Sequence, residues 1–266
     1  MADPDLSRRI VYNAAGMTDA DTLRRIVYKR EDDTDLLMDV YRPTGEGPGL
    51  RRPAIVFVHG GPIPKTMLPP REWGFFVSYG ELAAASGLVG VVLNHRLHDI
   101  TDYERALGDL SAGIDHVRRQ ADTLGIDADR LALWVFSGGG PLLAEFLRTQ
   151  PPYIRCVVAF YAVLDLRPFL PPDADAARRE RAARLSPALH VRAARFPIFV
   201  GRAGLDAPPV NNSIDAFVAE ALSANAPLDL MNHSTGHHAF DVLDNDERSR
   251  AIIGRALGFV QTHLSA

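Results

Sequence analysis

The chain has little cysteine and no long hydrophobic run, and both absences limit what it can be. Cys156 is the only cysteine among 266 residues, which excludes an internal disulfide and leads us to expect the reducing environment of the cytoplasm. No apolar stretch approaches the roughly 20 residues that a membrane-spanning helix needs. The first residues carry charges with no apolar run behind them, so the sequence predicts neither a membrane span nor a signal peptide.

An excess of charge of either sign is also missing. The chain has 29 lysine and arginine residues against 33 acidic residues, a net charge of −4. This balance does not indicate a nucleic acid or an anionic membrane as a partner. Hydrophobic residues make up 47% of the chain, enough for the core of one large domain that covers residues 1–266. The composition says nothing about the oligomeric state.

Short apolar runs alternate with amphipathic stretches along most of the chain. They predict strands at 36–41, 54–58, 88–93, 131–136, 155–160, 196–201 and 228–232, the first in a hairpin with residues 25–29. Helices are expected near 72–86, 101–124, 210–224 and 247–263. Strands that alternate with helices predict an α/β fold with a mostly parallel sheet and helices on both faces.

Residues 1–22 and 161–195 do not follow this alternation. We expect the first segment to be a loose lead-in. The second holds Pro171-Pro172 and an arginine-rich stretch typical of a solvated helix face, so it predicts a small cap insertion over the sheet. We expect a small pocket covered by apolar side chains of the insertion, Leu164, Phe169 and Leu170. An aromatic loop with Trp73, Phe75 and Phe76 is expected to close the other side of that pocket.

Ser137 stands where the central apolar run breaks into three glycines, Gly138–Gly140. Open α/β sheets place their chemistry at such carboxyl ends of strands. The glycines permit a sharp turn, which lifts the serine hydroxyl above the sheet and aims the Gly138 N–H at the group that the hydroxyl attacks. Ser137 is therefore a candidate nucleophile; the alternative is a plain glycine-rich turn with an incidental serine.

A serine nucleophile needs a base and an acid that orients the base. Asp206 follows the strand at 196–201, and His237 and His238 follow the strand at 228–232. Asp165, after the strand at 155–160, is the alternative acid. Other aspartates are set aside: Asp215 is better explained as a helix surface residue, and Asp241 and Asp244 come after the histidines. No glutamate follows the histidines in a metal-binding pattern, so we expect no metal.

From about residue 25 to its end, the chain resembles the α/β-hydrolases, in particular the small serine esterases and dienelactone hydrolases. Four motifs carry the resemblance: His59-Gly60-Gly61, the turn Val135-Phe136-Ser137-Gly138-Gly139, Gly204-Leu205-Asp206 and His238-Ala239-Phe240. Two features depart from the family. Val135 replaces the first glycine of the G-x-S-x-G turn, and Ser137 stands where dienelactone hydrolases have cysteine.

The resemblance implies the α/β-hydrolase fold and a triad of Ser137, Asp206 and His238. The family's glycine–any–histidine–small–phenylalanine pattern makes His238 the base and leaves His237 as a loop residue. The resemblance also implies an oxyanion hole that takes its N–H groups from Gly138 and from Gly60 or Gly61.

The function that the resemblance implies is hydrolysis of small carboxylic esters, without a cofactor and through an acyl-enzyme. We expect short acyl chains to be preferred. Two alternatives stay open: a peptidase or amidase of the prolyl-oligopeptidase type, and a non-catalytic ligand-binding protein on the same fold. The sequence identifies neither the acid nor the alcohol of the ester.

Overall fold

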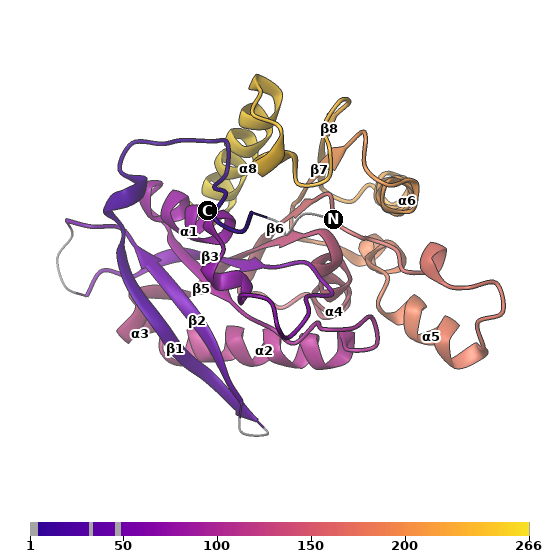
Figure 1. Ribbon diagram of the computed structural model, residues 1–266, viewed down its shortest axis with the longest axis horizontal. Coiled ribbons are helices and arrows are strands. Elements are labelled where there is room, and N and C mark those ends of the chain that lie inside the picture. Colours follow the sequence, from indigo (N-terminus) through magenta and orange to yellow (C-terminus); the bar gives the residue numbers. More distant parts are fainter. Residues whose placement is uncertain (1–4, 32–33, 46–48, 266) are drawn as a thin grey trace.

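The molecule is built around one twisted sheet (Figure 1). The computed structural model describes residues 5–31, 34–45 and 49–265. The sheet lies within these ranges. Its eight strands lie in the order β1-β2-β4-β3-β5-β6-β7-β8. Their bounds are β1 Asp21–Glu31, β2 Thr34–Arg42, β3 Arg52–Val58, β4 Val89–Leu93, β5 Ile126–Phe136, β6 Ile154–Phe160, β7 Ile198–Ala203 and β8 Leu228–His233. The pairs β1–β2 and β2–β4 are antiparallel, and every other neighbouring pair is parallel. The predicted hairpin and mostly parallel sheet are confirmed.

Helices connect the parallel strands and cover both faces of the sheet (Figure 1). They are α1 Gly74–Ala85, α2 Tyr103–Arg119, α3 Ala121–Leu124, α4 Leu143–Thr149, α5 Ala176–Arg184, α6 Pro208–Ser223, α7 Phe240–Leu243 and α8 Glu247–Ser265. The single helix predicted at 101–124 is divided at Gln120 into α2 and α3. The remaining predicted helices lie within two residues of their observed bounds.

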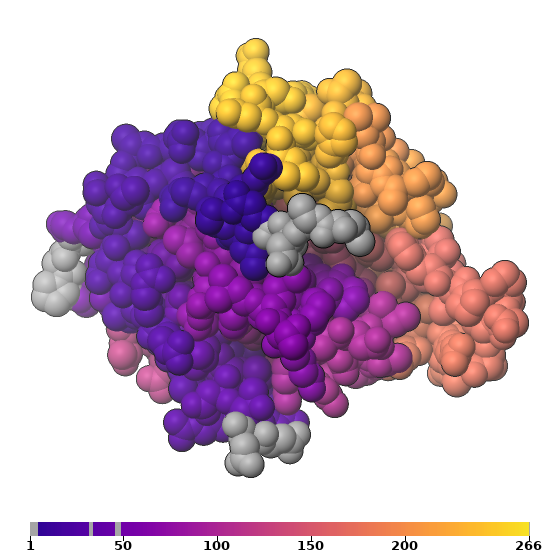
Figure 2. Space-filling model, viewed as in Figure 1, coloured from indigo at the N-terminus to yellow at the C-terminus, as the bar shows by residue number. Residues whose placement is uncertain are grey.

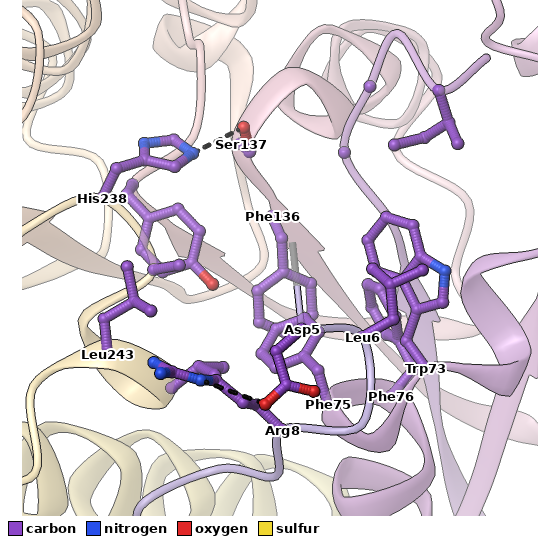
Figure 3. A pocket seen from close by; sticks show the side chains of 16 residues that line it. Asp5, Leu6, Arg8, Trp73, Phe75, Phe76, Phe136, Ser137, His238 and Leu243 are labelled. Atoms are coloured by element: carbon purple, nitrogen blue, oxygen red, sulfur yellow. Dashed lines mark hydrogen bonds and ion pairs between the residues drawn. The ribbon is translucent and has the colours of Figure 1, made fainter. Parts of the chain in front are cut away.

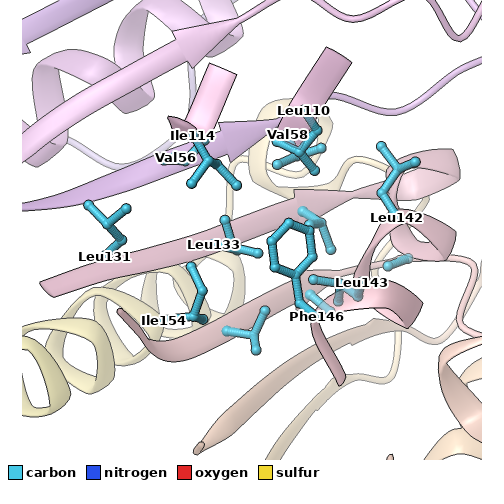
Figure 4. Close-up of a cluster of buried hydrophobic side chains, with 14 of the residues drawn as sticks. Val56, Val58, Leu110, Ile114, Leu131, Leu133, Leu142, Leu143, Phe146 and Ile154 are labelled. Carbon is cyan, nitrogen blue, oxygen red and sulfur yellow. The ribbon is translucent and has the colours of Figure 1, made fainter. Parts of the chain in front are cut away.

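The central strand β5 contributes to a separate hydrophobic core on each face. Leu131, Leu133 and Val135 point to the side covered by α2, α4 and α6, where they pack with Ile114 and Phe146 (Figure 4). The alternate residues Ala132, Trp134 and Phe136 belong to the second core, to which α1 and α8 contribute. A strand buried on both faces reads as a continuous apolar run, and this is why the sequence identifies it.

The N-terminal segment, residues 5–12, is bound to the rest of the molecule and is not a loose lead-in. The Gly74 N–H donates to the Leu6 carbonyl at 2.8 Å, and the Val11 N–H donates to the Asp241 carbonyl at 2.8 Å. The Ile10 N–H donates to Ser78 Oγ at 3.1 Å. These bonds fix the segment between α1 and α7, where Figure 2 shows it in indigo against the yellow C-terminal part.

Residues 161–195 form short helical turns and α5, which lies at the edge of the molecule (Figure 1). Two arginines of α5, Arg181 and Arg184, pair with Glu104 of α2. The arginine-rich stretch thus attaches α5 to the neighbouring helix through side chains that remain partly exposed, in keeping with the predicted solvated face.

Candidate active site

Ser137 occupies a strained turn directly after β5. Its φ of +50° lies in the left-handed region, which is uncommon for residues other than glycine and is often found at functional sites. The glycines that follow are required by close packing. A Cβ atom on Gly138 would collide with the Gly61 carbonyl oxygen, and one on Gly139 would lie 2.5 Å from the His59 carbonyl oxygen. The sequence therefore folds into a turn that presents the serine hydroxyl beyond the strand end.

Ser137, His238 and Asp206 form a continuous series of hydrogen bonds (Figure 3 shows the first pair). Nε2 of His238 lies 2.8 Å from Ser137 Oγ, and Nδ1 lies 2.7 Å from Asp206 Oδ2. A carboxylate only accepts, so Nδ1–H is the donor to Asp206 and Nε2 is left to accept the serine proton. The three residues follow β5, β8 and β7, whose carboxyl ends meet at one edge of the sheet.

Burial differs between the two partners of the imidazole. The Asp206 side chain is 4% exposed, whereas the His238 side chain is 41% exposed. The second oxygen of Asp206 accepts the Ala207 N–H at 2.7 Å, which fixes the carboxylate in its loop. The Asp206 carboxylate is thus buried beneath a partly exposed imidazole.

The alternative residues from the sequence have other partners. His237 is exposed and binds Asp244, with 2.9 Å between Nδ1 and Oδ1. Asp165 is buried but pairs with Arg167 and accepts a hydrogen bond from Ser186. Asp215 of α6 pairs with Arg202, as expected of a helix surface residue. The structure brings none of these three together with Ser137.

The loop after β3 places two glycines against the Ser137 turn. A Cβ atom on Gly60 would lie 2.8 Å from the Ser137 Cβ and 3.2 Å from the Gly138 nitrogen. His59 Nδ1 lies 2.6 Å from the Gly60 carbonyl oxygen. Because the carbonyl and the following N–H of a trans peptide point in opposite directions, this bond turns the Gly61 N–H away from His59.

His59 itself is buried and stacked on His95, with ring centroids 3.6 Å apart. The His95 N–H donates to His59 Nε2 at 3.1 Å, which leaves Nδ1 of His59 as the donor to Gly60. Burial lowers the pKa of both imidazoles, that of His95 to about 4. His59 is therefore a neutral brace for the glycine loop and not a second base.

A cavity of about 480 Å³ opens beside Ser137. Three groups of residues line it (Figure 3): an aromatic wall of Trp73, Phe75, Phe76 and Phe136; the N-terminal Asp5, Leu6 and Arg8; and Ala239, Val242 and Leu243 around α7. Trp73, Phe75 and Phe76 of this wall were predicted. The predicted roof is wrong, because Tyr161 is the only residue of 161–195 in the lining. Phe169 instead lies 44% exposed at the surface, and Leu164 is buried in the core.

Two features of the site escaped the sequence reasoning. One is the wall that Asp5, Leu6 and Arg8 contribute. The other is Asp241, set aside because it follows the histidines. Its side chain is fully buried and accepts the hydroxyls of Tyr79 at 2.6 Å and Tyr161 at 2.8 Å. The only sequence signal for it is an acidic residue within the apolar stretch 239–243.

Other chemistry finds little support in the part of the chain that the structure describes. Burial in β6 raises the pKa of Cys156 to about 12, which is unsuited to a thiolate nucleophile. Within residues 5–31, 34–45 and 49–265, no group of three or more histidine, cysteine, aspartate or glutamate residues is placed to hold a metal ion. None of the helices described there is long and apolar enough to cross a membrane.

The strand order, and a serine, an aspartate and a histidine after the carboxyl ends of β5, β7 and β8, define an α/β-hydrolase fold. The chain belongs to the BD-FAE family, which matches residues 38–184, more than half of its length.

Solved structures agree on the fold. Esterase Est2 of the planctomycete Thermogutta terrifontis with propionate bound is 24% identical, with a TM-score of 0.74 over 92% of this chain and 95% of that one. The same esterase phosphoramylated by tabun is 22% identical, with a TM-score of 0.70 over 94% and 95%. The structure of this esterase phosphorylated by paraoxon is 22% identical, with a TM-score of 0.69 over 93% of this chain and 94% of that one. No curated protein sequence matches the chain.

Proposed function

We propose that the protein is a serine carboxylic-ester hydrolase for small esters with short acyl chains. The observation that carries the proposal is the series Ser137–His238–Asp206, hydrogen-bonded beside an apolar cavity. Membership of the BD-FAE family and the fold shared with an esterase that organophosphates modify support it. No step of this chemistry requires a metal or an organic cofactor.

In the proposed acylation, Ser137 Oγ attacks the ester carbonyl while its proton passes to His238 Nε2. Asp206 holds the imidazole in the required tautomer and stabilises the imidazolium that forms. The negative charge on the carbonyl oxygen is stabilised by the N–H groups of Gly138 and of the Gly60–Gly61 loop. The carbon–oxygen bond to the alcohol then breaks, and His238 returns the proton to the leaving alkoxide.

Deacylation repeats these steps with water in place of the alcohol. His238 takes a proton from water as it attacks the acyl-enzyme, and the collapse of the second intermediate restores the Ser137 hydroxyl and releases the acid. The partly exposed imidazole is accessible to that water.

The cavity limits the size of the acyl group. An apolar pocket gains about 0.8 kcal/mol, roughly fourfold in affinity, for each methylene that it buries, until it is full. We propose that kcat/KM on p-nitrophenyl esters peaks at about two to six acyl carbons and falls beyond. We also propose that the protein is cytoplasmic, because it has one cysteine. From its charge balance we propose that it binds neither nucleic acid nor a membrane.

The proposal is tested with Ser137→Ala and with the neighbouring histidines. Ser137→Ala and His238→Ala should fold normally and lose about 10⁴-fold in kcat on p-nitrophenyl butyrate, because the three residues act as a unit. His237→Ala is the matched control and should stay within a few-fold of the wild type. Near wild-type turnover by Ser137→Ala would overturn the mechanism. Comparable turnover of the p-nitroanilide with the same acyl group would indicate an amidase, and no turnover of either would indicate a ligand-binding protein.

A further inference from the structure

Asp241 is a buried carboxylate with an unusual set of partners. Among the described residues, four other aspartates have fully or nearly fully buried side chains. Asp206 pairs with His238, and the other three each pair with an arginine: Asp39 with Arg71, Asp109 with Arg96 and Asp165 with Arg167. Among the same described residues, the Asp241 carboxylate instead accepts hydrogen bonds from two tyrosine hydroxyls. Its own charge is thus not cancelled by a permanent cation.

Tyr161 connects this carboxylate to the base. Its ring centroid lies 4.8 Å from that of His238, with 59° between the planes. The hydroxyl donates to Asp241 at 2.8 Å, and the N–H donates to the Gly201 carbonyl at 2.8 Å. The residue therefore lies against the imidazole and is fixed at both ends.

The backbone of Tyr161 is also strained. Its φ of +37° lies in the left-handed region, although the residue is a bulky aromatic. Such conformations persist where the surrounding structure holds them, and they gather at functional sites. Here the strain sets the direction in which the tyrosine ring leaves the end of β6, toward the cavity and His238.

The groups that face Asp241 and His238 come from five parts of the chain. Tyr79 comes from α1, Tyr161 from the end of β6, and the Val11 N–H from the N-terminal segment binds the Asp241 carbonyl. On its other sides the imidazole meets Ser137 after β5 and Asp206 after β7. The imidazolium that forms during catalysis is therefore a cation with two carboxylates in its surroundings, one in direct contact and one behind Tyr161.

The protonation states suit this arrangement at mildly alkaline pH. Burial raises the pKa of Asp241 to about 6, against the two tyrosine hydrogen bonds and the charge of His238, which lower it. Burial also raises the pKa of Tyr79 and of Tyr161 far above its usual range, so both hydroxyls keep their protons and donate. At pH 8 the carboxylate is consequently ionised.

We propose that Asp241 and Tyr161 are positioning residues for His238. Tyr161, anchored by Asp241, holds the imidazole between Ser137 and Asp206, and the buried charge of Asp241 stabilises the imidazolium. The proposal rests on the function proposed above, because it assigns these residues to the proton transfer of that reaction.

The test is Asp241→Asn in the full-length protein, with the pH dependence of kcat/KM on p-nitrophenyl butyrate as the readout. Asparagine keeps the shape and can accept from one hydroxyl while its amide group donates to the other, but it removes the charge. Without that charge the imidazolium is less stable, so the acid limb of the profile should move to lower pH by about half a unit or more. We expect kcat at pH 8 to fall about threefold to tenfold, with KM within twofold of the wild type.

Asp165→Asn is the matched control, because it removes the charge of another buried carboxylate that does not face His238. It should leave the profile in place. A wild-type profile and kcat in Asp241→Asn would overturn the proposal. So would an altered melting temperature with an unmoved profile, since that is the signature of a structural role alone.

Two tyrosine variants decide the matter if Asp241→Asn does not fold. Tyr161→Phe and Tyr79→Phe each remove one donor from the same carboxylate, but only Tyr161 contacts the imidazole. We expect the larger loss of kcat in Tyr161→Phe, and equal losses would contradict a positioning role. All of these comparisons presuppose turnover that depends on Ser137. Activity that survives in Ser137→Ala would instead refute the proposed function.

Discussion

Residues 5–12 and residues 161–195 are both irregular segments near the same site, but only the first contributes a wall to the cavity. The N-terminal segment is short and has few sequence features, and it places three side chains in the lining. The longer segment contributes Tyr161 alone. The difference is in where their side chains lie. Hydrogen bonds attach residues 5–12 to α1 and α7 beside the cavity, whereas Leu164 and Asp165 are buried in the interior and Phe169 is exposed at the surface.

This contrast shows that closeness to a catalytic strand end does not by itself bring a segment into the site. Asp165 follows β6 much as Asp206 follows β7, and both side chains are nearly fully buried. Arg167, two residues after Asp165, supplies a partner within the same turn. Asp206 has no such neighbour in sequence and pairs with His238.

The contrast between the two aspartates predicts the largest effect. Asp206→Asn should keep the geometry but favour the wrong imidazole tautomer, and kcat should fall about 10²–10⁴-fold. Asp165→Asn should stay within a few-fold of the wild type, because its carboxylate does not touch His238. Steady-state kinetics on p-nitrophenyl butyrate measure both. A large loss at Asp165 with a small one at Asp206 would move the acid to the segment after β6.

The attachment of the N-terminal segment predicts a smaller effect, on stability. A Cβ atom on Gly74 would collide with the Ser7 carbonyl, so Gly74→Ala must displace the segment. We expect the free energy of unfolding in urea to fall by about 1–3 kcal/mol. Gly108→Ala is the control: its Cβ would meet open space within α2, where alanine favours a helix by about 0.8–1 kcal/mol. Equal stability of Gly74→Ala and the wild type would show that the segment is not packed as described.

The smallest effect concerns acyl-chain preference. Leu6→Ala should enlarge the cavity, lower kcat/KM for the butyrate ester about threefold to tenfold, and move the optimum to longer acyl chains. Phe169→Ala removes a larger apolar side chain from residues 161–195, outside the cavity, and should leave the preference unchanged. A panel of p-nitrophenyl esters from acetate to decanoate measures both. If Phe169→Ala alone shifts the optimal acyl-chain length, residues 161–195 cover the cavity after all.

Much of the fold and the candidate site could be predicted from local signals. The buried strands are continuous apolar runs because both faces of the parallel sheet are covered. The glycines that its turn requires indicate Ser137, and the places after later strands indicate Asp206 and the pair His237 and His238. The family pattern then selects His238. Each of these signals lies within a few residues of the feature that it predicts.

The wall formed by residues 5–12 and the network around Asp241 could not be predicted in this way. The Gly74–Leu6 bond joins residues far apart in the chain, and Asp241 is 162 residues from Tyr79. Such pairings depend on how helices pack on the sheet, and a sequence pattern does not specify that packing. The mistaken roof has the same origin, since apolar residues such as Leu164 serve a core as readily as a pocket.

Covalent labelling tests the central claim, that Ser137 is the nucleophile, most directly. A fluorophosphonate should react with one equivalent of the protein, abolish ester hydrolysis and add its mass to the peptide that contains Ser137. The label should be absent from Ser137→Ala and present at the wild-type level in His237→Ala. Mass spectrometry that finds the adduct on another residue, or an unlabelled protein that still hydrolyses esters, would contradict the account.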